Sequence, residues 1–161
     1  MPTPSFITKL REKIGNDMLW LSGATAVIQR QSDQKILLVQ RSDSGAWTPI
    51  TGIVDPGENP ALTIRREAQE EANVSIEVIA LAQLKADPPH TFNNGDQCQF
   101  LDHTFYCHYI SGEERVNDEE STQVRWVSFE EAQELCSPRM LDRIDAALHW
   151  QDGVRFGYEQ V

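Results

Sequence analysis

The stretch from Gly52 to Val74, GIVDPGENPALTIRREAQEEANV, decides the fold of this chain of 161 residues. It places a glycine, an isolated glutamate and an Arg-Glu-x-x-Glu-Glu cluster at fixed offsets: Gly52, Glu58, Arg66, Glu67, Glu70 and Glu71. Carboxylates at positions i, i+3 and i+4 of a helix lie side by side, where their like charges repel one another. Such a trio is a poor stabilising device, but it suits a hard cation such as Mg²⁺, which prefers oxygen ligands.

The second half of this stretch is predicted to be a helix over residues 60–72. Residues 55–57, Asp-Pro-Gly, are typical of a turn, and Asn59 suits the N-cap position. Pro60 suits the first helical position, where its missing N–H costs nothing. Asn73 is expected at the end of the helix, because asparagine accepts the left-handed conformation that often follows a helix.

The pattern along this helix predicts which side packs on the core. Four apolar residues form a narrow stripe on one face: Ala61, Ile64, Ala68 and Ala72. Glu67, Glu70 and Glu71 fall roughly a right angle away from the stripe, and we expect them on the rim between core and solvent. Arg66 lies next to Glu70, where its guanidinium could hold a carboxylate in one rotamer. A glutamate-rich face taken alone is more often simply solvated.

The whole stretch resembles the signature of the Nudix hydrolases, G-x5-E-x7-R-E-U-x-E-E-x-G-U, in which U is a bulky apolar residue. Two positions of the signature differ here, since Ala68 is smaller than the usual aliphatic residue and Asn73 replaces the second glycine. Neither change removes a carboxylate. The remaining signature positions are all present: Gly52, Glu58, Arg66, Glu67, Glu70, Glu71 and Val74.

The resemblance implies both a reaction and the residues that perform it. Members of this family hydrolyse a nucleoside diphosphate linked to another group, with Mg²⁺ or Mn²⁺ as cofactor. By analogy, Glu67 and Glu71 bind the metal ion, and Glu70 is a further ligand or the base that deprotonates water. The analogy gives three further residues supporting roles: Glu58 in the metal shell, Arg66 in orienting the carboxylates, and the main-chain carbonyl of Thr51 as a ligand.

A glutamate outside the motif often joins the site in this family, usually in the loop before a strand that ends in an aromatic residue. Here Asp118-Glu119-Glu120-Ser121 precedes the segment Val124–Trp126. Glu120 is therefore the predicted additional ligand or base, with Glu119 as the alternative. An acidic run in a loop is also often merely solvated.

Candidate substrate contacts lie outside the motif. Arg41 ends a strand and could reach a phosphate. Trp47 could stack on a base, although a tryptophan beside a strand more often belongs to the core. Asp102 and Tyr106 share a strand face with Thr104 and could line the pocket.

Two histidines have weaker claims on the site. His103 lies on the strand face opposite to Asp102, and we interpret it as a core or interface histidine because no second ligand lies at a metal spacing. His90 follows Pro88-Pro89 in an expected loop, where contact with substrate and simple solvation are both open.

The composition favours a single intracellular domain. The chain is long enough for one core and short for two domains, so residues 1–161 are expected to form one unit, with 1–20 as a helical extension and 52–74 as the motif. It has no run of 18 apolar residues and no signal-peptide pattern, and its three cysteines have no C-x-x-C spacing. We therefore expect a cytoplasmic protein that binds no membrane. The net charge of −11 argues against nucleic acid as a partner.

The remaining segments predict an α+β protein. Helices are expected over 5–14, 129–135 and 138–150, the last with Ser137 as N-cap. Strands are expected over 24–30 and 35–41, joined by a turn at 31–34, and over 76–85, 99–110 and 124–127, with an extended segment over 47–54. This order suggests a mixed sheet with helices packed on it. The resemblance implies the same fold, a Nudix-type α/β/α sandwich.

Three classes of function remain open at this point. The first is a metal-dependent hydrolase acting on the diphosphate of ADP-ribose or another nucleotide sugar. The second is a MutT-like enzyme that hydrolyses noncanonical or oxidised nucleoside triphosphates. The third is a non-catalytic nucleotide sensor with the same fold. The motif does not distinguish between small-molecule nucleotide substrates, because substrate preference depends on the pocket. It also leaves a homodimer open, since many relatives are dimers.

Overall fold

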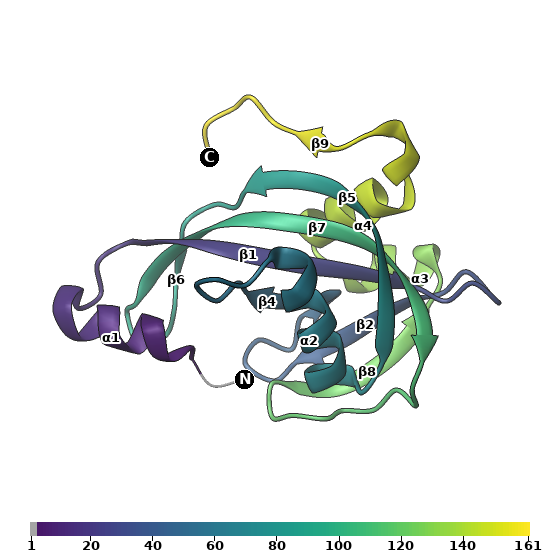
Figure 1. Ribbon diagram of the computed structural model, residues 1–161, viewed down its shortest axis with the longest axis horizontal. Helices are drawn as coiled ribbons and strands as arrows, with labels where there is room; N and C mark the ends of the chain where they lie inside the picture. Colours follow the sequence, from purple (N-terminus) through teal and green to yellow (C-terminus); the bar gives the residue numbers. More distant parts are fainter. Residues whose placement is uncertain (1–2) are drawn as a thin grey trace.

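A mixed β-sheet with two long parallel strands at its centre organises the molecule (Figure 1). The computed structural model describes residues 3–161, so Met1 and Pro2 of the predicted extension lie outside the described residues. Strand β1 (Leu19–Gln29) runs parallel to β7 (Gln97–Ser111), and β5 (Ser75–Ala86) pairs antiparallel with β7. On the other side, β2 (Ile36–Arg41) pairs with the end of β1, and β8 (Ser121–Val127) pairs with β2.

Four short strands complete the sheet within residues 3–161. Strands β3 (Trp47–Thr48) and β4 (Ile50–Ile53) follow each other in the chain but pair with different neighbours. Strand β3 pairs with β2, whereas β4 pairs with β1. The extended segment expected over 47–54 is therefore divided at Pro49, whose missing N–H interrupts a ladder. Strands β6 (His90–Thr91) and β9 (Arg155–Phe156) pair with β7 and β5.

The helices form the outer layers of the expected α/β/α sandwich, and Figure 1 shows α2 (Pro60–Ala72) on one face of the sheet. Helices α3 (Phe129–Leu135) and α4 (Pro138–Leu148) cover the other face, and α1 (Ser5–Ile14) lies at one end. Each face of the sheet has its own apolar cluster, one under α2 and one under α3 and α4. Among residues 3–161, no helix is long and apolar enough to cross a membrane.

Local sequence signals explain where the helices begin and end. The Ser137 hydroxyl accepts a hydrogen bond from the Met140 N–H, as expected for the N-cap of α4. Asn73 adopts the predicted left-handed conformation, with φ 57° and ψ 36°. Asn59 holds the N-cap position of α2, but its side chain makes no capping bond, and its carbonyl accepts the first helical N–H groups instead.

The element boundaries differ from the predictions mainly at their ends. Helices α1 and α3 have the predicted bounds, while β1 begins at Leu19 rather than Ala24. The last helix ends at Leu148, and a 3-10 turn, η1 (Trp150–Asp152), follows. The two-residue strands β6 and β9 were not predicted, because two residues carry no periodicity.

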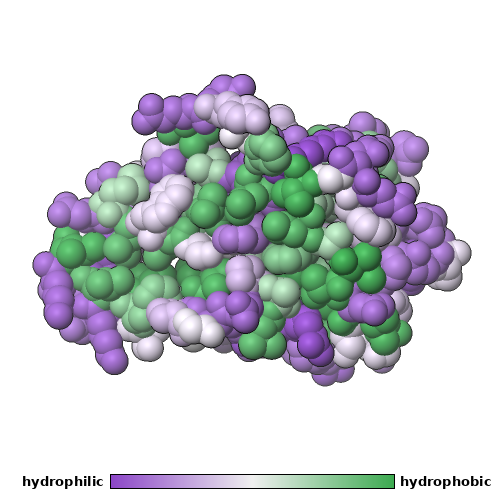
Figure 2. Space-filling model, turned by 45° about the horizontal axis from the view of Figure 1, so that its top comes forward, coloured by the Kyte–Doolittle hydropathy of each residue, from purple (hydrophilic) through white to green (hydrophobic). Residues whose placement is uncertain are grey.

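The surface carries both polar and apolar residues. On the face drawn in Figure 2, apolar residues spread across the middle of the molecule and polar residues gather towards its edges. The segment after α4 contributes several exposed apolar side chains: Val154, Phe156, Tyr158 and Val161. The homodimer stays a prediction. All three cysteines are free and buried, in accord with the expectation that the chain has no disulfide scaffold.

Candidate active site

Two of the motif glutamates are completely buried. Glu67 has 0% and Glu71 1% of its surface exposed, whereas Glu70 lies on the outer side of α2. The prediction that all three lie on the rim between core and solvent is therefore wrong for Glu67 and Glu71. It holds only for Glu70.

The connection between β7 and β8 explains the burial of Glu71. Residues 112–120 pass over the C-terminal end of α2, and Arg115 N–H donates to the Ala72 carbonyl while Asn117 N–H donates to the Glu71 carbonyl. The side chain of Asn73 donates to the Glu113 carbonyl and fastens the same connection. A helical wheel counts only the helix itself, so it cannot show that a distant segment covers one edge.

Gly52 explains the burial of Glu67. A Cβ atom at position 52 would lie 2.4 Å from Cγ and 2.6 Å from Oε1 of Glu67, closer than real Cβ contacts allow. Because Gly52 has no side chain, its position on β4 leaves the space that the Glu67 carboxylate fills. This close approach is the physical reason for the first glycine of the motif.

Arg66 ties three carboxylates together. Its guanidinium donates to both oxygens of Glu58 at 3.0 Å, to Glu67 Oε1 at 2.8 Å and to Glu70 Oε2 at 3.2 Å. These hydrogen bonds lower the pKa of Glu58 to about 2, and the Thr63 hydroxyl adds to the effect. The predicted contact between Arg66 and Glu70 is present, and Arg66 orients two further glutamates as well.

The buried carboxylates lack enough partners within the protein. Among residues 3–161, Glu67 Oε2 and both carboxylate oxygens of Glu71 are buried without a hydrogen-bond partner. Burial raises the pKa of Glu67 to about 7 and that of Glu71 to about 8. A buried carboxylate without a partner is costly, and a divalent cation would satisfy these oxygens.

The donor set therefore fits a hard cation. In the part of the chain that the structure describes, no three His, Cys, Asp or Glu side chains form a ready cation site. Arg66 already engages one Glu67 oxygen, which leaves Oε2 and the two Glu71 oxygens as the donors without partners.

A cavity of about 490 Å³ lies next to the motif, although none of the four motif glutamates is among its lining residues. Thr51 and Gly52 form part of its wall, and Glu67 lies directly behind Gly52. The cavity continues between the sheet and α4 towards the N-terminal segment. Its lining includes most of the residues predicted outside the metal cluster: Arg41, Trp47, His90, Asp102 and Glu120. Its size is typical of a small-molecule site.

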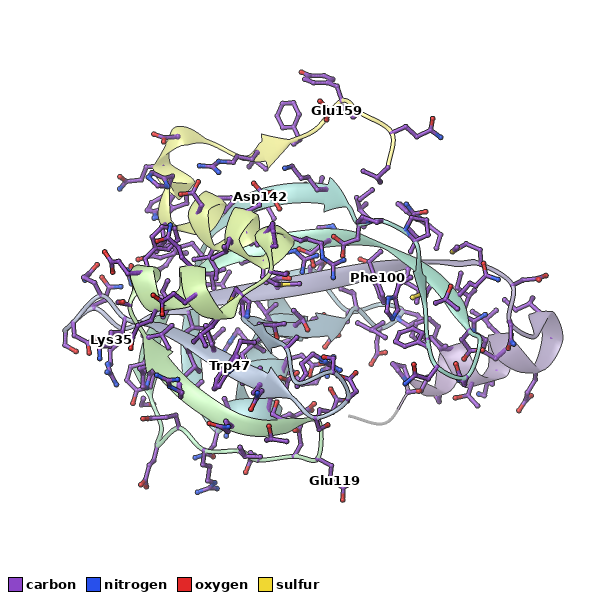
Figure 3. All side chains as sticks on the ribbon, turned by 180° about the vertical axis from the view of Figure 1, so that it is seen from behind. Lys35, Trp47, Phe100, Glu119, Asp142 and Glu159 are labelled. Carbon is purple, nitrogen blue, oxygen red and sulfur yellow. The ribbon has the colours of Figure 1, made fainter. Side chains whose placement is uncertain are left out.

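Glu120 and Glu119 point in different directions. Glu120 lines the cavity, and its Oε2 lies 3.9 Å from Nη1 of Arg41. Glu119 is exposed, and Figure 3 shows its side chain directed away from the body of the molecule. Arg41 also forms an ion pair with Asp43, so a guanidinium and a carboxylate lie together in the lining of the cavity.

Tyr106 and His103 lie elsewhere. Tyr106 is buried in the cluster beneath α4, where its hydroxyl donates to Gln29 Oε1 and its ring stacks on Trp150. It does not line the cavity, so the structure does not place it with the other candidates. His103 is half-buried, and its Nδ1 lies 2.9 Å from the Gly23 carbonyl, which accords with a structural histidine.

Many cavity residues were missing from the prediction, among them the polar residues Thr48, Asp87, Arg139 and Arg143. The guanidinium of Arg143 is buried, and its Nη2 donates to both oxygens of Asp87 at 2.8 and 2.6 Å. The only sequence signal was the spacing of four between Arg139 and Arg143, which puts both on one face of α4. That spacing alone is common on solvated helices.

The comparisons with known proteins identify the family to which this fold and this site belong. The family model described as NUDIX domain matches residues 20–148. This chain therefore belongs to the Nudix family and is a Nudix hydrolase. Nudix hydrolases generally use divalent metals and act on small nucleotide substrates.

Several known proteins are similar to this chain. A MutT-like protein of Streptomyces ambofaciens is 27% identical over 130 residues, which covers 78% of this chain and 79% of that protein. The NAD-capped RNA hydrolase NudC of Mannheimia succiniciproducens is 31% identical over 87 residues, 54% of this chain and 30% of that protein.

Solved structures agree on the fold. A MutT protein from Methanosarcina mazei has a TM-score of 0.66 at 17% identity, covering 85% of this chain and 99% of that one. An Ap4A hydrolase of C. elegans has a TM-score of 0.64 at 21% identity, covering 83% and 98%.

Proposed function

We propose that this chain hydrolyses the diphosphate bond of a nucleoside diphosphate linked to another moiety, such as ADP-ribose or a nucleotide sugar, with Mg²⁺ or Mn²⁺ as cofactor. One observation carries the proposal: the carboxylates of Glu67 and Glu71 are buried with unpartnered oxygens, and Glu67 lies against Gly52, which is part of the wall of a cavity of about 490 Å³. In this proposal residues 1–161 form one domain, in which 1–20 is an extension that packs on the sheet through Ile7.

The proposed metal ligands are Glu67 and Glu71, with Glu70 and the Thr51 carbonyl beside them. Glu58 and Arg66 hold this set in place, because Arg66 bonds to Glu58, Glu67 and Glu70 together. Bound there, the cation would offset the negative charge that builds up on the phosphoryl oxygens.

Glu120 and Glu70 are the candidates for the base that takes the proton from water. Glu120 faces the cavity, whereas Glu70 lies on the outer surface of α2 and is engaged by Arg66. We assign proton removal to Glu120 and keep Glu70 as a ligand. Water then adds to one phosphorus atom while the bridging oxygen leaves, and Arg41 lies close enough to the cavity to bind a phosphate oxygen.

The test of metal dependence is direct. Activity should vanish with EDTA and return with Mg²⁺ or Mn²⁺, and both Glu70→Gln and Glu120→Gln should lower kcat at least ~10²-fold. Only Glu120→Gln should also remove the acidic limb of the pH–rate profile, since that limb reports the base. Glu119→Gln, one residue away and exposed, is the matched control. Wild-type turnover in Glu120→Gln would overturn the assignment.

A second candidate is the hydrolysis of nucleoside triphosphates. The similarity to the MutT-like protein of Streptomyces ambofaciens over most of both chains favours it. A screen across nucleoside triphosphates, ADP-ribose, nucleotide sugars, dinucleoside polyphosphates and NADH separates the two, because only triphosphates release inorganic diphosphate. Binding without turnover of any of these compounds would favour a non-catalytic nucleotide sensor instead.

A further inference from the structure

The lining of the cavity includes a buried carboxylate. Asp102, on β7, is 5% exposed and lines the cavity. Its Oδ1 accepts a hydrogen bond from the Thr25 hydroxyl at 2.9 Å, and its Oδ2 accepts one from the Thr104 hydroxyl at 2.7 Å. Nε of Arg143 lies 3.5 Å from Oδ2. These contacts fix the rotamer of the carboxylate.

Asp102, which lines the cavity, has hydrogen-bonding capacity left on one oxygen. Oδ1 has one partner among residues 3–161, and a carboxylate oxygen has room for two. Gly23, which also lines the cavity, lies next to this oxygen, and a Cβ atom there would stand 3.6 Å from Oδ1. The glycine therefore keeps the approach to Oδ1 open.

Arg143 belongs to the support of this carboxylate. Its Nη1 donates to the Thr25 hydroxyl at 2.9 Å, and its Nη2 donates to both oxygens of Asp87. The guanidinium donors are thereby engaged by the protein. Asp102 is the group left to contact a ligand, and Arg143 is a positioning residue.

The walls around Asp102 suit a flat, partly polar group. Trp47 on β3 and Phe100 on β7, both labelled in Figure 3, line the cavity, as does Phe92. Thr48 also lines it, and its Oγ1 is buried without a hydrogen-bond partner in residues 3–161. Aromatic walls stack on planar rings, whereas the Thr48 oxygen is closed off from the cavity.

We propose that Asp102 is a specificity-determining residue that accepts a hydrogen bond from the amino group of a nucleobase bound among Trp47, Phe92 and Phe100. A carboxylate only accepts hydrogen bonds, so an amino group at this place is favoured and an oxo group is repelled. A base is favoured over a sugar because the aromatic side chains of Trp47, Phe92 and Phe100 line the cavity. This inference rests on the proposed function, since it names the nucleoside that the hydrolase accepts.

The first experiment uses uncharged nucleosides and EDTA, so that neither the metal nor hydrolysis affects the result. NMR titrations of the full chain compare adenosine with inosine and cytidine with uridine, pairs in which an oxo group replaces the amino group and the adjacent ring nitrogen gains a proton. In at least one pair, the amino member should bind at least about tenfold more tightly, because the oxo member leaves a buried acceptor without a donor. Equal binding within about threefold in both pairs, or no binding at the solubility limit, would overturn the inference.

The second experiment removes the discrimination. Asp102→Asn keeps the shape of the side chain but places a donor or an acceptor at Oδ1, so the amino-to-oxo preference should fall to within about threefold. Asp142→Asn is the matched control, because Asp142 lies on the same helix as Arg143 but holds Lys85 and Gln83 outside the cavity. An unchanged preference in Asp102→Asn contradicts the role of Asp102. If Asp102→Asn does not fold, Gly23→Ala tests the same point, because its Cβ atom would lie in van der Waals contact with Oδ1 at 3.6 Å and cover that oxygen, with Cδ1 of Phe100 at 3.3 Å.

Kinetics separate a contact from a merely structural residue. On a hydrolysed substrate such as ADP-ribose, Asp102→Asn should raise KM for the amino-bearing nucleotide at least about tenfold and leave kcat within about threefold. A fall in kcat with unchanged KM would show that the variant disturbs the metal end instead. If the wild-type protein hydrolyses nothing, the proposed function fails, while the nucleoside titrations still decide the role of Asp102.

Discussion

Glu71→Gln should stabilise the protein when no metal is present, although the variant removes a proposed ligand. In the metal-free protein, burial raises the pKa of Glu71 from its ordinary value of 4.5 to about 8. An acid with a raised folded-state pKa keeps its proton in the folded chain after the unfolded chain has lost it. Stability is therefore undisturbed below pH 4.5 and falls as the pH rises towards 8.

The magnitude follows from the pKa shift. At 1.36 kcal/mol for each unit of pH, the interval from 4.5 to 7 costs the metal-free wild type about 3 kcal/mol at pH 7. A buried glutamine amide without partners costs about 1–3 kcal/mol itself, so the net gain of Glu71→Gln is up to about 2 kcal/mol. For a chain of this size, that gain raises the Tm by up to about 8 °C.

The assay is thermal unfolding in EDTA at pH 5 and pH 7, followed by the same melts with Mg²⁺. Glu71→Gln should exceed the wild type at pH 7 and be less stable than the wild type at pH 5, because the wild type regains about 2.7 kcal/mol over these two pH units. With Mg²⁺, only the wild type should gain stability, since ligand binding stabilises the folded state alone. Glu70→Gln is the control, because its half-exposed carboxylate should change metal-free stability by no more than about 0.5 kcal/mol. A Glu71→Gln protein that is less stable than the wild type in EDTA at pH 7 would refute the reasoning.

Three shorter predictions concern neighbouring features. Gly52→Ala should fold, by circular dichroism, but lose at least about tenfold in kcat/KM, because its Cβ displaces the Glu67 carboxylate; unchanged activity would mean that this contact has no role. Asn73→Gly should cost no more than about 1 kcal/mol in a denaturant melt, since glycine accepts the left-handed conformation and only the side-chain bonds are lost; a larger cost would refute the cap argument. Burial raises the pKa of the Cys136 thiol to about 11 and that of Cys107 further, so a thiol reagent should react with them at pH 8 only after unfolding, and rapid reaction in the folded protein would contradict this.

The sequence predicted the fold where local chemistry decides it. The proline and serine signals at the start of α4 and the asparagine at the end of α2 act within one helical turn, so their positions could be predicted without the rest of the chain. The order of strands and helices likewise indicated the mixed sheet between two helical layers. The motif spacing indicated the family.

Long-range packing could not be predicted in the same way. Glu71 is buried because residues 112–120 cross the end of α2, and nothing in the spacing of the glutamates reveals that segment. Asp102 was a candidate only from strand alternation, and its support by Arg143 joins residues from β7 and α4. Tyr106 followed the same alternation but lies under Trp150, because only part of that strand face borders the cavity.

Binding of Mn²⁺ tests the central claim most directly. In an electron paramagnetic resonance titration, the wild-type chain should bind Mn²⁺, and Glu67→Gln combined with Glu71→Gln should weaken binding at least about tenfold and abolish hydrolysis. Glu119→Gln, which removes an exposed carboxylate, should bind as the wild type does. Equal Mn²⁺ affinity in the wild type and the double variant would contradict the claim that the two buried glutamates hold the metal ion.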